Sequence, residues 1–446
     1  MDTAHTFSSE SQWLFDYLRG RAERVLASLL RNTPLAVAFG GLALWLLVVR
    51  ASRWRRYNAI HRKYGPKWNN GLGTINPREA QEIIHLSTVY DMPTLLYHAV
   101  SFALFKTYGI PSISKLLVAT KELCSKETMS RRYADTEILI STWHTCPISG
   151  FADPSISLRN TGPNARPAED PRANIALARV NYLHSKYKIS NSDYLYTLCL
   201  FANEPSYWSD RYGWRYLSPL ERHAFYVFWA EVGRKMNIQD IPGSLEEMTA
   251  FIKEYEEAHM VPAETNREVA GYTLDELLSP VPNALGLKAF ATSIVVSVLS
   301  DRTREAMMYR KRPWIYRSIL NGTLLTAAFI QRFLLLPRYT GYYVVDHKLP
   351  NNVDMEHTRM HPTRYAARPW YKPESTSIIG RYTDKLLVKL GFYLEMPSAH
   401  LKSDGYRLEE MGPMKFENAG HEEVMQNAAK LQGCPITGPW SLDGRK

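Results

Sequence analysis

Cysteine is scarce in this 446-residue sequence, which contains only four cysteines and no CxxC pair. Proteins of oxidising compartments more often carry a disulfide framework, so a reducing compartment is favoured. A structural zinc site made of thiolates is not indicated either, because such a site needs clustered cysteines. With 45% hydrophobic and 22% charged residues, the chain has the composition of a globular protein rather than of a disordered one.

Several well-known enzyme motifs are also missing. The sequence has no GxxxxGKS/T phosphate loop, no GxGxxG after a strand and no GxSxG nucleophile elbow. Gly71-Leu72-Gly73 is a lone GxG, which we interpret as a turn. No nucleic-acid-binding motif accompanies the formal net charge of +10.

Strand signals are weak, whereas helix start signals recur. Asn76 and Ser218 each begin a capping box with proline in the first turn, and Ser244 and Thr273 begin simpler versions of it. We therefore predict an all-α domain, with a polar and irregular C-terminal extension that packs over it. One apolar-periodic piece lies within that extension, near residues 382–394.

Residues 33–49 carry no charge, and this stretch reaches the lower limit of the roughly 17–25 residues that cross a bilayer as a helix. The alternatives are a cleaved signal peptide, which fits poorly after a mixed 32-residue segment, or a buried core helix. Two later segments, 283–300 and 315–336, are also long and apolar. We interpret them as core helices, or as helices that lie in the membrane surface, rather than as further membrane-spanning helices.

Acidic residues are absent from residues 50–67, which contain seven lysines and arginines, whereas residues 1–32 contain four arginines and four acids. The positive-inside rule therefore predicts a lumenal N-terminus and a cytosolic location for the large C-terminal part. The basic excess next to an apolar span indicates attraction to anionic lipid rather than to nucleic acid. The predicted organisation is a lumenal segment 1–32, an anchor 33–49, a basic linker 50–74, a helical domain 75–340 and an irregular extension 341–446.

The segment Asp170 to Lys188 predicts a helix that Asp170 can cap. His184 is the one histidine on its apolar, small-residue face. It is either an axial ligand to iron or a core histidine bonded to a backbone carbonyl.

A second helix is predicted over about residues 128–146. Arg132, Asp135 and Thr136 share one face with apolar residues, namely Leu139, Ile140 and Trp143. This face either lines a site or, at Arg132 and Asp135, is a solvated turn at the helix start.

Two other stretches are less specific. Residues 153–170 predict a long loop, which is either a functional lid or a disordered insertion. Asp354, His357 and His361, with His347 upstream, have ligand chemistry, but Pro362 and polar surroundings argue against a zinc site there.

The segments RRYADTEILISTW, NYLHSKY and YLYTLCLFANEPSYW, with the SPLERHAFYVFWAEVGRKMNI and MVPAETNREVAGYTLDELL stretches, resemble the mpaB-type oxygenases. These fungal enzymes of the endoplasmic reticulum share a catalytic domain with the bacterial rubber oxygenases, also called latex-clearing proteins. The resemblance covers roughly residues 75–340.

The resemblance implies a globin-like helical domain that holds haem b through one proximal histidine, and the matching position is His184. Rubber oxygenases carry an R-x-x-K-T motif across the haem. Here Arg132 and Thr136 match, but Asp135 replaces the lysine. A carboxylate cannot copy a neutral amine ligand, so the sixth iron position is open, filled by water or occupied differently. Glu122 and Glu137 are candidates for the family's catalytic base by sequence proximity alone.

From this resemblance, we expect Arg132, Asp135 and Thr136 to order oxygen or substrate, and Arg132 or Lys188 to pair with a haem propionate. The expected activity is oxidative cleavage of a C=C bond in a farnesyl-type chain by O2, in a meroterpenoid such as an intermediate of mycophenolic acid biosynthesis. The expected partners are this lipophilic substrate, O2, the endoplasmic reticulum membrane and possible pathway enzymes in it. Two rival functions stay open: a haem-free lipid hydrolase or isomerase, and a haem- or lipid-binding membrane protein without turnover.

Overall fold

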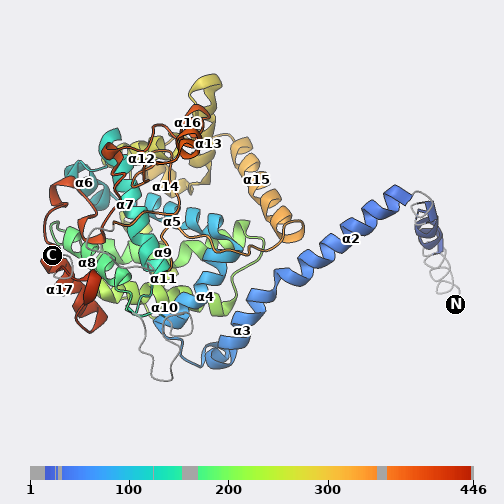
Figure 1. The fold of residues 1–446 in the computed structure, drawn as a ribbon, viewed down its shortest axis with the longest axis horizontal. Coiled ribbons are helices and arrows are strands. Elements are labelled where there is room, and N and C mark those ends of the chain that lie inside the picture. Colours follow the sequence, from blue (N-terminus) through green and yellow to red (C-terminus); the bar gives the residue numbers. More distant parts are fainter. Residues whose placement is uncertain are drawn as a thin grey trace. The chain divides into compact units, whose positions relative to one another are not determined.

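The computed structural model describes residues 16–25, 27–28, 33–123, 125–152, 169–348 and 359–442. Within these ranges the chain is helical, with two isolated β-bridges and no strand (Figure 1). The prediction of an all-α protein is therefore confirmed. The α-helices are α2 Thr33–Arg53, α3 Arg55–Trp68, α4 Pro77–His85, α5 Pro93–Thr107, α6 Pro111–Thr120, α7 Lys126–Thr145, α8 Arg172–His184, α9 Asn191–Tyr212, α10 Pro219–Lys235, α11 Leu245–His259, α12 Glu264–Leu277, α13 Leu287–Val298, α14 Asp301–Ala306, α15 Trp314–Phe333, α16 Ile378–Lys389 and α17 His421–Gln432.

The chain divides into two compact units, of which the smaller comprises residues 1–58 and 329–337. In it, Trp45 donates a 2.8 Å hydrogen bond to the carbonyl of Leu334, and Arg53 donates to the carbonyls of Gln331 and Leu335. Among the described residues, one helical stretch, Pro34–Gly71, is long and apolar enough to cross a membrane, and only 6% of its most apolar window is buried. This exposure is inconsistent with a core helix.

The larger unit comprises residues 59–328 and 338–446. The predicted capping boxes at Asn76 and Ser218 are both formed, and they begin α4 and α10. Ser244 caps α11 as predicted. The start predicted at Thr273 is wrong: this residue lies inside α12, and its hydroxyl donates to the carbonyl of Val269. A Thr-x-x-Glu pattern cannot begin a helix whose preceding turns are already formed.

Helix α8 lies in the core of the larger unit and packs against α7 and α17. Nearly all of its residues are buried, including two arginines. The predicted cap at Asp170 is wrong, because Pro171 occupies the cap position, without a side-chain cap bond. Asp170 instead forms a bidentate ion pair with the buried Arg172, with both nitrogen–oxygen distances at 2.8 Å. The helix ends at His184, four residues before Lys188.

Of the segment beyond residue 340, the described residues form two α-helices, α16 and α17, joined by short 3-10 turns. Arg179 of α8 holds this segment in place by donating to the carbonyls of Met411, Phe416 and Ala419 at 2.7–2.9 Å. The expectation that the extension packs over the helical domain is therefore confirmed. By contrast, α15 has no buried residue, so it is not a core helix.

Candidate active site

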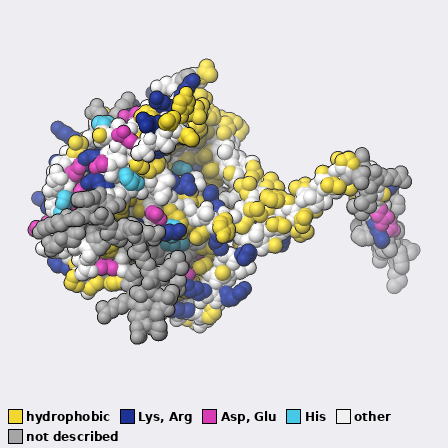
Figure 2. Space-filling view, in the orientation of Figure 1, with side chains coloured by type: hydrophobic (Ala, Val, Ile, Leu, Met, Phe, Trp, Pro, Cys, Tyr) yellow, Lys and Arg dark blue, Asp and Glu magenta, His cyan; other side chains and the backbone are white. Residues whose placement is uncertain are grey.

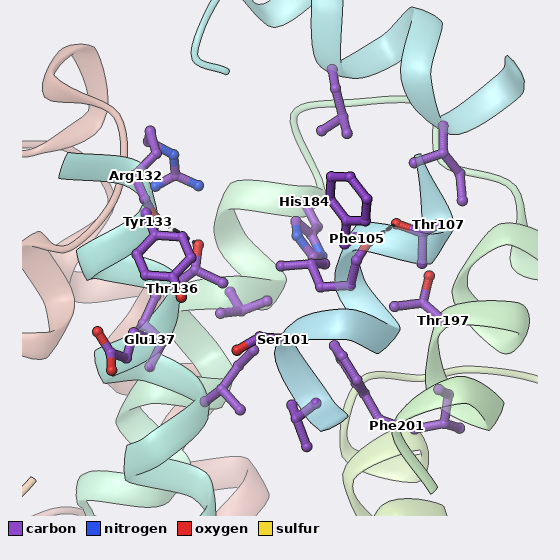
Figure 3. Close-up of a pocket in the computed structure, with 18 of the residues that line it drawn as sticks. Ser101, Phe105, Thr107, Arg132, Tyr133, Thr136, Glu137, His184, Thr197 and Phe201 are labelled. Carbon is purple, nitrogen blue, oxygen red and sulfur yellow. Dashed lines mark hydrogen bonds between the residues drawn. The ribbon is translucent and has the colours of Figure 1, made fainter. Parts of the chain in front are cut away.

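Helices α7 and α8 border a cavity of about 350 Å³ inside the larger unit. Side chains from α5, α6, α9, α10 and α12 complete its wall, which consists mainly of Leu, Ile, Val, Phe and Trp. Its volume lies at the lower end of the range of about 300–1,000 Å³ that is typical of sites for small organic ligands. Figure 3 shows Arg132, Tyr133, Thr136 and Glu137 on one side of this space and His184 across it.

The imidazole of His184 faces the cavity from the last turn of α8. Its Nδ1 atom is buried and makes no hydrogen bond to any residue that the structure describes. Burial, with a contribution from the nearby Arg132 cation, lowers the pKa of His184 to about 4. The ring is therefore neutral at physiological pH, and a nitrogen lone pair is available to a ligand. The alternative interpretation, a core histidine bonded to a backbone carbonyl, is not supported at Nδ1, because this atom makes no such bond in the described part of the chain.

Five of the six residues predicted to share one face of α7 do line the cavity: Arg132, Thr136, Leu139, Ile140 and Trp143. The Thr136 hydroxyl donates a 2.8 Å bond to the Arg132 carbonyl one turn earlier, and its oxygen can still accept a second bond. Arg132 Nη1 is buried without a hydrogen-bond acceptor among the described residues. The indole nitrogens of Trp143 and Trp229, another lining residue, share that property. These three residues of the wall therefore carry buried nitrogens without a hydrogen-bond acceptor in the described chain, although Arg132 Nη1 also lies 3.7 Å from the Asp135 carboxylate.

Asp135 is the sixth residue of that face, and it is not among the lining residues. Its carboxylate is fully buried and accepts a 2.6 Å bond from the Tyr371 hydroxyl and a 3.2 Å bond from the Gly412 amide. The nearest nitrogens of Arg131 and Arg132 lie at 3.9 and 3.7 Å. The residue that replaces the lysine of the R-x-x-K-T motif thus attaches the C-terminal segment to α7.

Glu137 also lines the cavity, whereas Glu122 does not. The Tyr97 hydroxyl donates a 2.7 Å bond to the Glu137 carboxylate, and the hydroxyls of Tyr97 and Tyr133 lie 3.2 Å apart. Burial raises the pKa of Glu137, while the bond from Tyr97 opposes that rise. A buried carboxyl with a raised pKa holds a proton more readily than an exposed one. Sequence proximity alone could not separate Glu137 from Glu122.

The other candidate residues lie elsewhere. Lys188 is exposed and is not part of the cavity wall. His361 Nδ1 lies 2.7 Å from the Tyr371 carbonyl, and the His347 ring stacks on Tyr343. Asp354, His357 and residues 153–168 of the expected loop lie outside the described residues. In the described ranges, no three histidine, cysteine or acidic side chains are grouped as a metal site.

Residues 166–330 match the family described as ER-bound oxygenase mpaB/B'/Rubber oxygenase, catalytic domain. His184 lies within this match, and the Arg132–Thr136 turn precedes it. The ER-bound oxygenase mpaB' of Penicillium brevicompactum is 28% identical over 423 residues, which cover 90% of this chain and 93% of that protein. The ER-bound oxygenase mpaB of Penicillium roqueforti (strain FM164) is 31% identical over 288 residues, or 61% of this chain and 89% of that protein.

This chain is helical and encloses an apolar cavity with a neutral histidine in its wall. The chain belongs to the family of mpaB-type ER-bound oxygenases and rubber oxygenases. The resemblance seen in the sequence is thereby confirmed. The globin-like detail of the fold stays a prediction.

Proposed function

We propose that this protein is a membrane-anchored, haem-dependent oxygenase that cleaves a C=C bond of a prenyl chain with O2. One observation carries the proposal: the neutral imidazole of His184 presents a buried, unpartnered nitrogen beside an apolar cavity, opposite the Arg132–Thr136 turn. The family supports an oxygenase, and the names of the relatives support attachment to the endoplasmic reticulum.

The residues of the cavity fit haem b in three respects. His184 supplies a single neutral nitrogen donor, which is what a porphyrin-bound iron requires from the protein on one face. The wall is apolar, as a porphyrin ring requires. Arg132 supplies a guanidinium at the cavity wall that suits a propionate, and its Nη1 also lies 3.7 Å from the Asp135 carboxylate. When bound, haem iron supplies the one-electron and O2 chemistry that no side chain of this site supplies.

The chain's own residues would bind and orient the substrate and exclude water from it. The apolar wall holds the hydrocarbon chain and keeps water away from its double bond. The Thr136 oxygen and the Arg132 guanidinium offer polar contacts at one side of the cavity. Glu137, bonded to Tyr97, holds or takes up a proton at its carboxylate. In the overall reaction, both atoms of one O2 molecule enter the two carbonyl groups that replace the cleaved C=C bond, so no further reductant is needed.

The substrate class follows from the lining and from the candidate anchor. Isoprenoid carbons match an apolar cavity, and a prenylated aromatic compound of the mycophenolic acid type partitions into a bilayer. A chain held at the endoplasmic reticulum by α2, with its catalytic part in the cytosol, would meet such a compound at a high local concentration.

Oxygen uptake by the detergent-purified full-length protein with a farnesylated phenol tests this proposal. We expect uptake coupled to a shortened aldehyde or ketone that carries label from isotopic O2. If haem is bound but neither uptake nor product appears with any prenylated compound, the protein is a binder without turnover. A product that forms without O2, or that takes its oxygen from water, supports the hydrolase or isomerase instead.

A further inference from the structure

Helix α16 exposes a continuous apolar stripe that no part of the described chain covers. Ile378, Ile379, Tyr382, Leu386 and Leu390 are between 52% and 80% exposed. At 100° per residue these positions span a sector of about 120° on one side of the helix. Phe392 and Leu394 extend the exposed apolar surface beyond the helix end.

The opposite side of α16 is fixed to the larger unit. Asp384 is buried and accepts 2.8 Å bonds from Lys372 Nζ and the Ser375 hydroxyl. The chain after the helix returns to the body through a 2.8 Å bond from the Leu394 amide to the Ala367 carbonyl. The apolar stripe therefore faces outward because the other face of the helix is already held.

Basic side chains lie beside the stripe. Arg381, Lys385 and Lys389 follow one another at four-residue spacing, and all three are exposed. The one acidic residue of the helix is the buried and paired Asp384. The outward surface of α16 thus combines large apolar side chains with three cations and no anion. In Figure 2, hydrophobic and basic side chains gather over the region where Figure 1 labels α16.

We propose that α16 is a membrane-surface helix, which places its apolar stripe among the acyl chains and its basic residues against the headgroups of anionic phospholipid. This combination of features is typical of helices that lie in the membrane interface. Charge complementarity favours an anionic bilayer as the surface that α16 contacts, because the helix carries three cations beside its apolar stripe. The proposal goes beyond anchoring by α2 and does not depend on the oxygenase activity.

Site-specific fluorescence in reconstituted vesicles tests the proposal with the full-length chain. An environment-sensitive label is attached to a Leu386→Cys variant, in a background where Cys124 and Cys434 are replaced by serine. Nitroxide lipids then report contact with acyl chains. We expect shallow nitroxides to quench the label at position 386, and phosphatidylserine to increase this quenching relative to phosphatidylcholine alone.

Two further label positions serve as controls. Leu44→Cys lies in α2 and reports the anchor, and Ala258→Cys lies on the exposed side of α11 and reports a surface away from α16. Exchanging Arg381, Lys385 and Lys389 for glutamate should abolish the phosphatidylserine-dependent part of the quenching at position 386. Glutamate at three other exposed basic positions, Lys115, Lys253 and Arg267, should leave it unchanged.

The controls separate the possible failures. Quenching at position 44 but not at 386 overturns the proposal for α16 while the α2 anchor stands. Loss of quenching at both positions places the chain off the bilayer and also overturns it. If the label at 386 becomes shielded from water without lipid quenching and the chain cross-links to itself, α16 is an interface between two copies, which contradicts the proposal.

Discussion

The hydroxyl of Tyr371 donates a 2.6 Å hydrogen bond to the carboxylate of Asp135, which lies on the helix that also carries Arg132 and Thr136. Lys372, the next residue, binds Asp384 of α16. The segment around Tyr371 therefore connects α7 at the cavity to α16 at the surface. Tyr371 itself adopts a φ of 64°, a left-handed conformation that is rare for a residue with a side chain.

We expect Tyr371→Phe to lower the free energy of unfolding by about 1–3 kcal/mol, because a fully buried carboxylate loses a donor. Tyr382→Phe is the matched control: this tyrosine is largely exposed, so its loss of a hydroxyl should have little effect. Urea denaturation in detergent measures both variants. Equal stability of the two variants would contradict the structural role of Tyr371.

Asp135→Lys restores the lysine of the R-x-x-K-T motif in sequence, but we expect it to destabilise the protein more than Tyr371→Phe does. The Tyr371 hydroxyl and the Gly412 amide both lose their acceptor, and a third cation joins Arg131 and Arg132 in a buried place. The same denaturation series tests this order. A lysine variant as stable as the wild type would show that this part of the chain rearranges freely.

Arg179 attaches the C-terminal segment to α8 through three hydrogen bonds. We expect Arg179→Met to cost at least about 3 kcal/mol, because three carbonyl oxygens lose a charged donor. Limited proteolysis should then cut within residues 411–432 before it cuts elsewhere in the described domain. Arg234→Met is the control, since Arg234 is mostly exposed and pairs with Glu231 on its own helix. Protection of residues 411–432 in the Arg179 variant would contradict this role.

Glu137 should govern a proton step without affecting haem binding. We expect Glu137→Gln to lower kcat by at least about tenfold while the haem spectrum stays unchanged, whereas Glu122→Gln, outside the cavity, should retain activity. Tyr97→Phe removes a bond that lowers the pKa of Glu137. The limb of the pH profile that reports Glu137 should therefore move to higher pH. An unmoved limb would exclude Glu137 as the titrating group.

His184 should make stability depend on pH. Its pKa is about 4 in the folded protein and 6.5 ordinarily, so below about pH 6.5 the unfolded chain binds a proton that the folded chain excludes. The free energy of unfolding should fall between about pH 6.5 and 4, by about 3 kcal/mol at most. His184→Gln in the haem-free protein should flatten this part of the curve. Parallel curves for the two proteins would contradict the low pKa.

Much of the fold and part of the site could be predicted from the sequence. The caps at Asn76 and Ser218 and the face of α7 are set by local patterns, because neighbours at helical spacing must share a side. The position of Asp135 could not be predicted, since its partners Tyr371 and Gly412 are more than 230 residues away in the chain. Helix α17 was missed because its few buried positions give a weak periodic signal in a polar segment.

The absorbance spectrum of the full-length protein loaded with haem tests the central claim most directly. We expect a Soret band in the wild type, its loss or strong weakening in a folded His184→Ala variant, and its recovery when free imidazole is added. Far-UV circular dichroism confirms that the variant is folded. A folded wild type without bound haem, or a His184→Ala variant with an unchanged Soret band and haem affinity, would contradict the assignment of His184 as the iron ligand.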